Sequence, residues 1–162
     1  MLTVISDTSV ISNFIHLNRL DILHTLYDHI YLPPSVFEEV RRLPVKSLSL
    51  SAFQEADWII VKSPVNEELV ENLLAKLDKG EAEAIVLALE LNADFLLVDE
   101  LLGRQEAQKY GLSIIGTLGI MLKAKKENLL ASIKPMMEIL IDRGFWISKD
   151  LYQKVLVLAD EV

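Results

Sequence analysis

Five short apolar segments, separated by longer stretches with helical periodicity, most constrain what this chain can fold into. The segments cover residues 2–6, 29–32, 58–61, 95–98 and 112–115. Short apolar segments rich in β-branched residues are typical of strands that are buried on both faces of a parallel sheet. Because such segments alternate with helices, the sequence predicts an α/β fold whose strands are joined by right-handed crossovers.

Helical segments fill the stretches between these strands. We expect one to begin just after Asp7 and others over 19–27, 34–40, 66–77, 80–91, 101–110, 117–125, 131–141 and 149–158. The least regular stretch is 43–56. We expect a single domain over residues 1–162, in which residues from about 128 to 162 form a helical C-terminal extension.

Composition narrows the class of protein. The chain has 162 residues, of which 51% are hydrophobic, so it can bury a substantial core. The absence of cysteine excludes disulfides and thiolate metal sites. The N-terminal residues show no basic segment and no small-residue cleavage site, and no apolar run approaches the length of a membrane span. We therefore expect a cytoplasmic protein without a membrane segment.

The net charge is −8, with an isoelectric point near 4.9. This charge argues against tight, non-specific binding of nucleic acid. It is compatible with a nuclease, because an acid-lined metal site contributes negative charge that bound cations offset. The local basic groups are Arg41, Arg42, Lys46, Arg104, Lys123, Lys125 and Lys126.

Carboxylates recur close to the ends of the predicted strands. Asp7 follows the first strand, and Asp99 and Glu100 follow the fourth. Glu39 closes the motif that begins at Pro34, and Glu81 lies at the start of the motif that begins at Gly80. In an open α/β sheet, ligands bind outside the carboxyl ends of the strands, where the strand order reverses. Acids that converge there would repel one another unless a cation lay between them, and oxygen ligands suit Mg²⁺ or Mn²⁺. The pattern favours metal-assisted phosphodiester chemistry.

Each of these acids also has an ordinary structural explanation. Asp7 can cap the helix that follows it, and for this residue alone capping is the preferred interpretation. Asp78 and Glu81 resemble a capping box. Asp99 and Glu100 can be the cap and a first-turn acid of the next helix. The repetition of acids at successive junctions is what favours a site over capping.

Helical geometry separates neighbouring candidates. Glu38 and Glu39 point about 100° apart on a helix, and we assign Glu39, which lies near the apolar positions of its helix, to the site. Glu81 and Glu83 cannot share a face. We assign Glu81, because it aligns with Ile85 one turn further on.

The sequence lacks the motifs of several other kinds of site and enzyme. His16, His24 and His29 form no zinc-binding pair, and neither a Gly-rich dinucleotide motif nor a Walker motif occurs. The motif at Asp7 lacks the second aspartate of haloacid-type phosphatases. The aromatic residues Trp58, Phe145 and Trp146 are expected in the core or in an interface rather than as base-stacking platforms.

Four motifs occur in one order along the chain. They begin at Asp7 (Asp-Thr-Ser-Val), Leu32 (Leu-Pro-Pro-Ser-Val-Phe-Glu-Glu-Val), Gly80 (Gly-Glu-Ala-Glu-Ala-Ile) and Leu96 (Leu-Leu-Val-Asp-Glu, with Gly103-Arg104 after it). This series resembles the PIN domain, in particular its prokaryotic subfamily of predicted nucleic-acid-binding proteins. The subfamily also shows stretches similar to residues 111–119 and 145–160, so the resemblance covers essentially the whole chain.

The resemblance implies a three-layer α/β/α fold with a central parallel sheet of about five strands. It implies a ribonuclease that uses Mg²⁺ or Mn²⁺, with Asp7, Glu39, Glu81 and Asp99 as catalytic and metal-binding residues. Glu100 is a further metal-binding candidate, although the subfamily commonly has two aspartates where this chain has Asp99-Glu100. Many small members resemble VapC-type toxins, which an antitoxin partner keeps inactive and which are usually homodimers.

Two further residues are candidates for contact with an RNA substrate. Ser9 can orient Asp7 or hydrogen-bond a metal-bound water. Arg104 can contact a phosphate, and a salt bridge to Glu100 or Glu106 is an equal alternative. Two rival functions stay open from the sequence: a catalytically inactive PIN-like module that binds nucleic acid or protein, and a metal-dependent phosphatase.

Overall fold

The computed structural model describes residues 2–162, which form two compact units. The N-terminal unit ends at Gly116 and holds all five strands. The C-terminal unit, Thr117–Val162, consists of three helices and their connections. No helix within residues 2–162 is long and apolar enough to cross a membrane.

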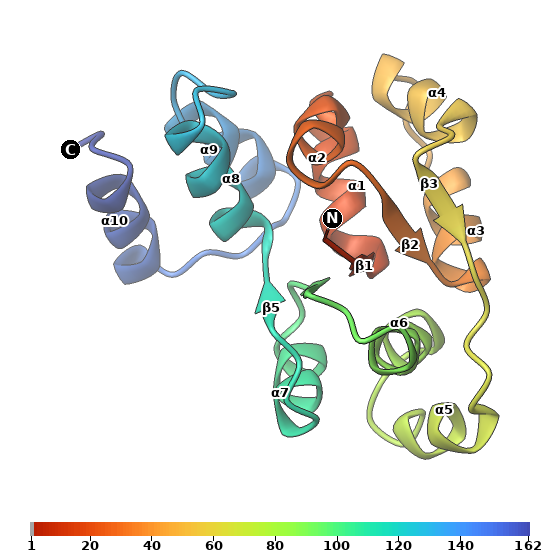
Figure 1. The fold of residues 1–162 in the computed structure, drawn as a ribbon. Coiled ribbons are helices and arrows are strands. Elements are labelled where there is room, and N and C mark those ends of the chain that lie inside the picture. Colours follow the sequence, from red (N-terminus) through yellow and green to blue (C-terminus); the bar gives the residue numbers. More distant parts are fainter. Residues whose placement is uncertain (1) are drawn as a thin grey trace. The chain divides into compact units, whose positions relative to one another are not determined.

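The N-terminal unit is built on one parallel sheet (Figure 1). Its strands are β1 (Val4–Ser6), β2 (Ile30–Leu32), β3 (Ile59–Val61), β4 (Phe95–Leu97) and β5 (Ile114–Ile115). They lie in the order β3-β2-β1-β4-β5, and every paired neighbour runs parallel. The predicted α/β fold with five parallel strands is therefore confirmed.

Helices bury both faces of this sheet. All three residues of β1 are buried, as expected for a central strand of a covered parallel sheet. Helix α6 (Lys79–Glu90) packs against β1 and β4, and Ile5 and Leu96 from these strands join Ile85 and Leu87 in one hydrophobic cluster. Successive side chains of a strand point to opposite faces, so Val4 and Ser6 face away from α6.

Six further helices belong to the N-terminal unit. They are α1 (Thr8–His16), α2 (Leu20–Tyr27), α3 (Pro34–Arg41), α4 (Leu48–Glu55), α5 (Glu67–Leu73) and α7 (Leu101–Lys109). Asp7, Asn66 and Asp78 cap α1, α5 and α6 through side-chain hydrogen bonds, and Pro34 occupies the first turn of α3.

Helix α4 lies in the stretch that showed the least regular pattern. Its start is fixed by Ser47, whose Oγ accepts a hydrogen bond from the Leu50 amide at 3.1 Å. Phe53, a residue of this helix, has a buried side chain. Trp58, which follows it, is only 8% exposed and stacks on His24, so it belongs to the core as expected. Trp146, in contrast, is 82% exposed.

The C-terminal unit contains α8 (Thr117–Lys126), α9 (Lys134–Asp142) and α10 (Lys149–Leu158). Helix α9 begins three residues later than predicted, with Pro135 in its first turn. Its N-cap residue, Ile133, has no side chain that could satisfy the free amides of that turn.

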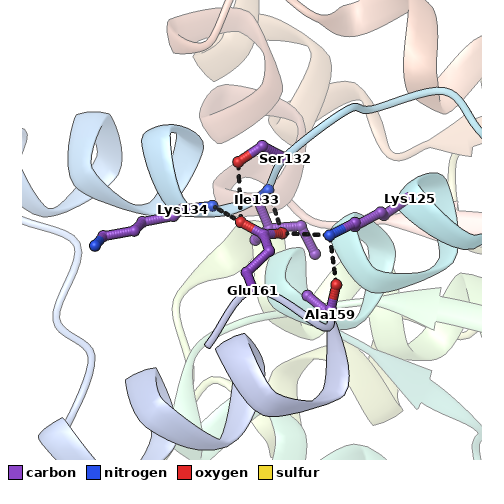
Figure 2. A network of polar contacts seen from close by, with 6 residues as sticks. All are labelled: Lys125, Ser132, Ile133, Lys134, Ala159 and Glu161. Carbon is purple, nitrogen blue, oxygen red and sulfur yellow. Dashed lines mark hydrogen bonds and ion pairs between the residues drawn. The ribbon is translucent and has the colours of Figure 1, made fainter.

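Glu161 supplies the missing cap (Figure 2). Its carboxylate accepts hydrogen bonds from the amides of Ile133 (2.8 Å) and Lys134 (3.0 Å) and from the hydroxyl of Ser132 (2.9 Å). Lys125 Nζ lies 2.9 Å from the same carboxylate and also donates to the carbonyl of Ala159. Burial raises the pKa of Glu161, but these donors outweigh it and lower the pKa to about 2.

Candidate active site

The strand order reverses between β1 and β4, and this is where Asp7 and Asp99 lie. Residue Ser6 pairs with Leu97, and the Asp7 amide donates to the Leu97 carbonyl at 3.0 Å. The chain turns from β1 toward β2 on one side, whereas β4 and β5 lie on the other. Both aspartates therefore follow strands at the switch point, the usual ligand position of such sheets.

A pocket of about 220 Å³ lies at this edge of the sheet. It is lined by Asp7, Thr8, Ser9, Ser12, Glu39, Asp78, Glu81 and Glu100. Five of these residues are acids, three carry hydroxyl groups, and none carries a positive charge. The structure thus gathers four of the carboxylates singled out from the sequence, and adds Asp78.

Asp7 is almost completely buried, at 2% exposure. One of its oxygens accepts hydrogen bonds from Ser9 Oγ (3.0 Å) and from the Val10 amide (3.4 Å), so the residue does cap α1. Burial, and next the charge of Asp99, raise the pKa of Asp7 to about 8 in spite of these donors. Nearby, the buried Thr8 Oγ1 has no hydrogen-bond partner among the described residues.

The two adjacent glutamates of α3 have different surroundings. Glu38 pairs with Arg41 (2.8 Å) and Arg42 (3.4 Å), whereas Glu39 lines the pocket. Gly80 is what lets α6 approach this carboxylate, because a Cβ on Gly80 would stand 3.3 Å from Glu39 Oε1. The inward placement expected for Glu39 is therefore what the structure shows.

Glu81 lines the pocket and also forms the capping box that was its structural alternative. Its amide donates to Asp78 at 2.8 Å, and its Oε1 accepts from the Asp78 amide at 3.2 Å. Its Oε2 lies 3.1 Å from the position that a Cβ on Gly103 would take. Burial raises the pKa of Glu81, and the charges of Asp78 and Glu100 raise it further.

Asp78 was considered only as a cap from the sequence. The signal that identifies it as a pocket residue is the capping box itself, because the cap and its N3 partner must lie side by side. Once Glu81 is placed at the pocket, Asp78 is placed there as well.

Asp99 and Arg104 do not line the pocket. Asp99 Oδ2 accepts a hydrogen bond from Asn13 Nδ2 at 3.1 Å. Arg104 Nη1 donates to the carbonyl of Val98 at 3.1 Å instead of pairing with Glu100 or Glu106. The Glu106 carboxylate pairs with Lys76 (3.2 Å) and Lys109 (2.8 Å), so the structure does not show the Arg104–Glu106 salt bridge that was one alternative.

The donor set of the pocket fits a hard divalent cation. Five carboxylates without a positively charged neighbour, one of them desolvated, form an arrangement that a cation would stabilise. Within residues 2–162, however, no three acidic side chains already stand close enough together to coordinate one ion. A cation would therefore bind only if side chains moved, and Glu39 and Glu100 are exposed enough to do so.

The fold is that of an open α/β protein, and the usual ligand position of such a sheet, its switch point, is lined here by carboxylates. The family model that matches this chain, over residues 3–161, is that of the PIN domain. The chain belongs to the PIN-domain family, which confirms the resemblance inferred from its motifs. PIN domains are generally nucleases and typically use divalent metals. A search of curated proteins found no match.

Proposed function

We propose that this chain is a metal-dependent endoribonuclease that hydrolyses RNA phosphodiester bonds. The observation that carries the proposal is the pocket in which Asp7, Glu39, Glu81 and Glu100 converge without a positive charge, in a chain of the PIN-domain family. The net charge of −8 does not oppose the proposal, because the acids that contribute to it include those of the pocket.

Asp7, Glu39, Glu81 and Asp99, with Glu100, would hold Mg²⁺ or Mn²⁺. When bound, such an ion supplies an activated water and stabilises negative charge on the phosphate. Ser9 holds Asp7 by its hydroxyl and so keeps one carboxylate oxygen in a fixed position. Burial of Asp7 excludes bulk water from the base of the pocket, which strengthens electrostatic interactions there.

The direct test is cleavage of a mixed-sequence single-stranded RNA. We expect cleavage with Mn²⁺ or Mg²⁺ and none with EDTA. The variants Glu39→Gln and Glu81→Gln should lose at least 100-fold in rate, since each removes an anionic oxygen from the pocket. Asp94→Asn is the matched control, because Asp94 accepts from the Thr3 amide and precedes β4, so it lies at the opposite edge of the sheet. Equal loss in this control would contradict the assignment.

The affinity for Mn²⁺ should depend on pH. A carboxylate must be ionised to bind a metal, and the pKa of Asp7 is raised to about 8. We expect the dissociation constant to fall about tenfold for each pH unit between 6 and 8 and to level off above pH 8. Isothermal titration calorimetry in buffers of different ionisation enthalpy measures both the affinity and the proton released. Affinity that is constant over this range would contradict a role for Asp7 as a ligand.

Residues 2–162 contain no preformed metal-coordinating group, and this favours one rival function, a catalytically inactive module that binds nucleic acid or protein. The two functions differ in their response to metal. A nuclease site should raise the melting temperature when millimolar Mg²⁺ or Mn²⁺ is added, because ligand binding to the folded state stabilises it. No rise in melting temperature together with no cleavage would favour the binding module.

We further propose, from the family resemblance, that the protein is a cytoplasmic homodimer and the toxin of a toxin–antitoxin pair. Light scattering of the purified chain would give its mass in solution. Expression of the wild-type chain should arrest growth, and expression of a Glu81→Gln variant should not. Growth that is unaffected by the wild-type chain would oppose the toxin role while leaving the ribonuclease proposal intact.

A further inference from the structure

Helix α1 presents two neutral hydrogen-bond donors one turn apart. Ser9 and Asn13 are separated by four residues and therefore lie on one stripe of the helix. Ser9 Oγ donates to Asp7 at 3.0 Å, and Asn13 Nδ2 donates to Asp99 at 3.1 Å. Each of the two aspartates at the switch point is thus held by its own donor from the same helix.

The second oxygen of Asp99 faces a different part of the N-terminal unit. A Cβ on Gly116 would stand 2.7 Å from both Asp99 Oδ1 and Arg104 Nη1. These two atoms therefore share the space that glycine leaves open after β5. Arg104 is fixed there by its hydrogen bond to the Val98 carbonyl, and this places its guanidinium beside the Asp99 carboxylate.

We infer that Asn13 and Gly116 are positioning residues that hold the Asp99 carboxylate beside the pocket, with Arg104 as its counter-charge and not as a contact to RNA. The pocket is lined by Asp7, Glu39 and Glu81 but not by Asp99. Whether the Asp99 carboxylate can coordinate a bound cation then depends on the direction in which its neighbours hold it. Hydrogen-bond partners of a metal ligand typically change metal affinity 10- to 100-fold when they are mutated.

This inference rests on the proposed metal site, and it is tested without measuring cleavage. In Asn13→Asp, the donor becomes a carboxylate that repels Asp99. In Gly116→Ala, the new Cβ forces Asp99 or Arg104 to shift. We expect each variant to bind Mn²⁺ at least 10-fold more weakly than the wild-type chain, as measured by electron paramagnetic resonance of the free ion. Asn92→Asp is the charge-matched control, since Asn92 lies in an exposed turn with φ of 50° that Asp also tolerates.

A double variant separates positioning from folding. Asn13→Asp combined with Asp99→Asn restores a hydrogen bond with donor and acceptor exchanged. We expect its melting temperature in EDTA to recover relative to Asn13→Asp, while Mn²⁺ binding stays weak because the carboxylate is on the wrong residue. Recovery of both properties would overturn the inference and leave Asn13 with a structural role only.

The remaining outcomes are distinct. Equal Mn²⁺ binding by the wild-type chain and Asn13→Asp would overturn the positioning role alone. No Mn²⁺ binding by the wild-type chain would overturn the proposed function, and the inference with it. Weaker binding in Asn13→Asp and Gly116→Ala but not in Asn92→Asp supports it.

Discussion

Replacing Asp7 by asparagine is expected to make the metal-free protein more stable while abolishing metal-dependent cleavage. Asp7 is 2% exposed, and burial together with the charge of Asp99 raises its pKa to about 8. Ionising this residue in the folded protein is therefore unfavourable. Asparagine keeps an oxygen that can accept from Ser9 and Val10, but it carries no charge to desolvate. Cleavage should fall by at least 1,000-fold, because the most buried anion of the site is lost.

The pH dependence gives the sign of this effect. The pKa of Asp7 rises from 3.8 to about 8, so its protonated form contributes stability that is present below about pH 4. That contribution to the free energy of unfolding is lost progressively as the pH rises from about 4 through 8. On the order of 4 kcal/mol of it has been lost by pH 7. Wild-type protein in EDTA should therefore melt at lower temperature at pH 8 than at pH 5, with a gap that Asp7→Asn narrows by about 5–10 °C.

Calorimetric melts at pH 5, 6, 7 and 8 measure this difference directly. Asp94→Asn is again the control, because Asp94 is exposed and should leave the slope unchanged. Saturating Mn²⁺ should reverse the order of stability at pH 8, since only the wild-type site gains from the ion. A variant that is less stable than wild type at pH 8 in EDTA would show that the hydrogen bonds of Asp7 outweigh its desolvation.

Glu161→Gln is expected to cause a large loss of stability in the C-terminal unit. The carboxylate is 11% exposed and serves four donors, among them Lys125 and the two amides that open α9. Glutamine has a single acceptor oxygen and leaves Lys125 without its ion pair, so we expect a loss on the order of 3 kcal/mol. Because the pKa of Glu161 is lowered to about 2, the same contribution should vanish in wild type as the pH falls from 4.5 to 2.

Hydrogen exchange at individual amides locates this effect. The amides of Ile133 and Lys134 should exchange markedly faster in Glu161→Gln than in wild type at pH 6, because their acceptor is lost. Glu127→Gln is the matched control, since Glu127 is exposed in the same unit. Unchanged protection of both amides in Glu161→Gln would mean that the cap is not held in solution.

Much of the fold was predictable because its signals are local. The five apolar segments contain the five strands, and Asp7 and Asp78 cap helices where their positions suggested. Helix α4 was missed because its short apolar pattern is weak without the Ser47 cap, which only the folded backbone reveals. Glu161 was missed as well, because a cap supplied from a distant residue leaves no motif.

Four of the five acids that line the pocket were singled out from the sequence, but their contacts were not predictable. Helical geometry was enough to distinguish Glu39 from Glu38, because neighbouring residues on a helix must face different ways. It could not show that Asp99 is held by Asn13, since the two are 86 residues apart. Nor could it show that Arg104 bonds to the Val98 carbonyl, because its possible acidic partners were equally near in sequence.

The cap on α9 has a consequence for the order in which the chain becomes structured during synthesis. Residues 132–134 emerge from the ribosome well before Glu161, which lies 28 positions after Ile133. Until that residue appears, the first amides of α9 must be satisfied by water, and Lys125 has no anion to hold it. The C-terminal unit can therefore reach its final stability only after Glu161 has been synthesised, so a nascent chain stalled before residue 161 should remain open to proteases at α9.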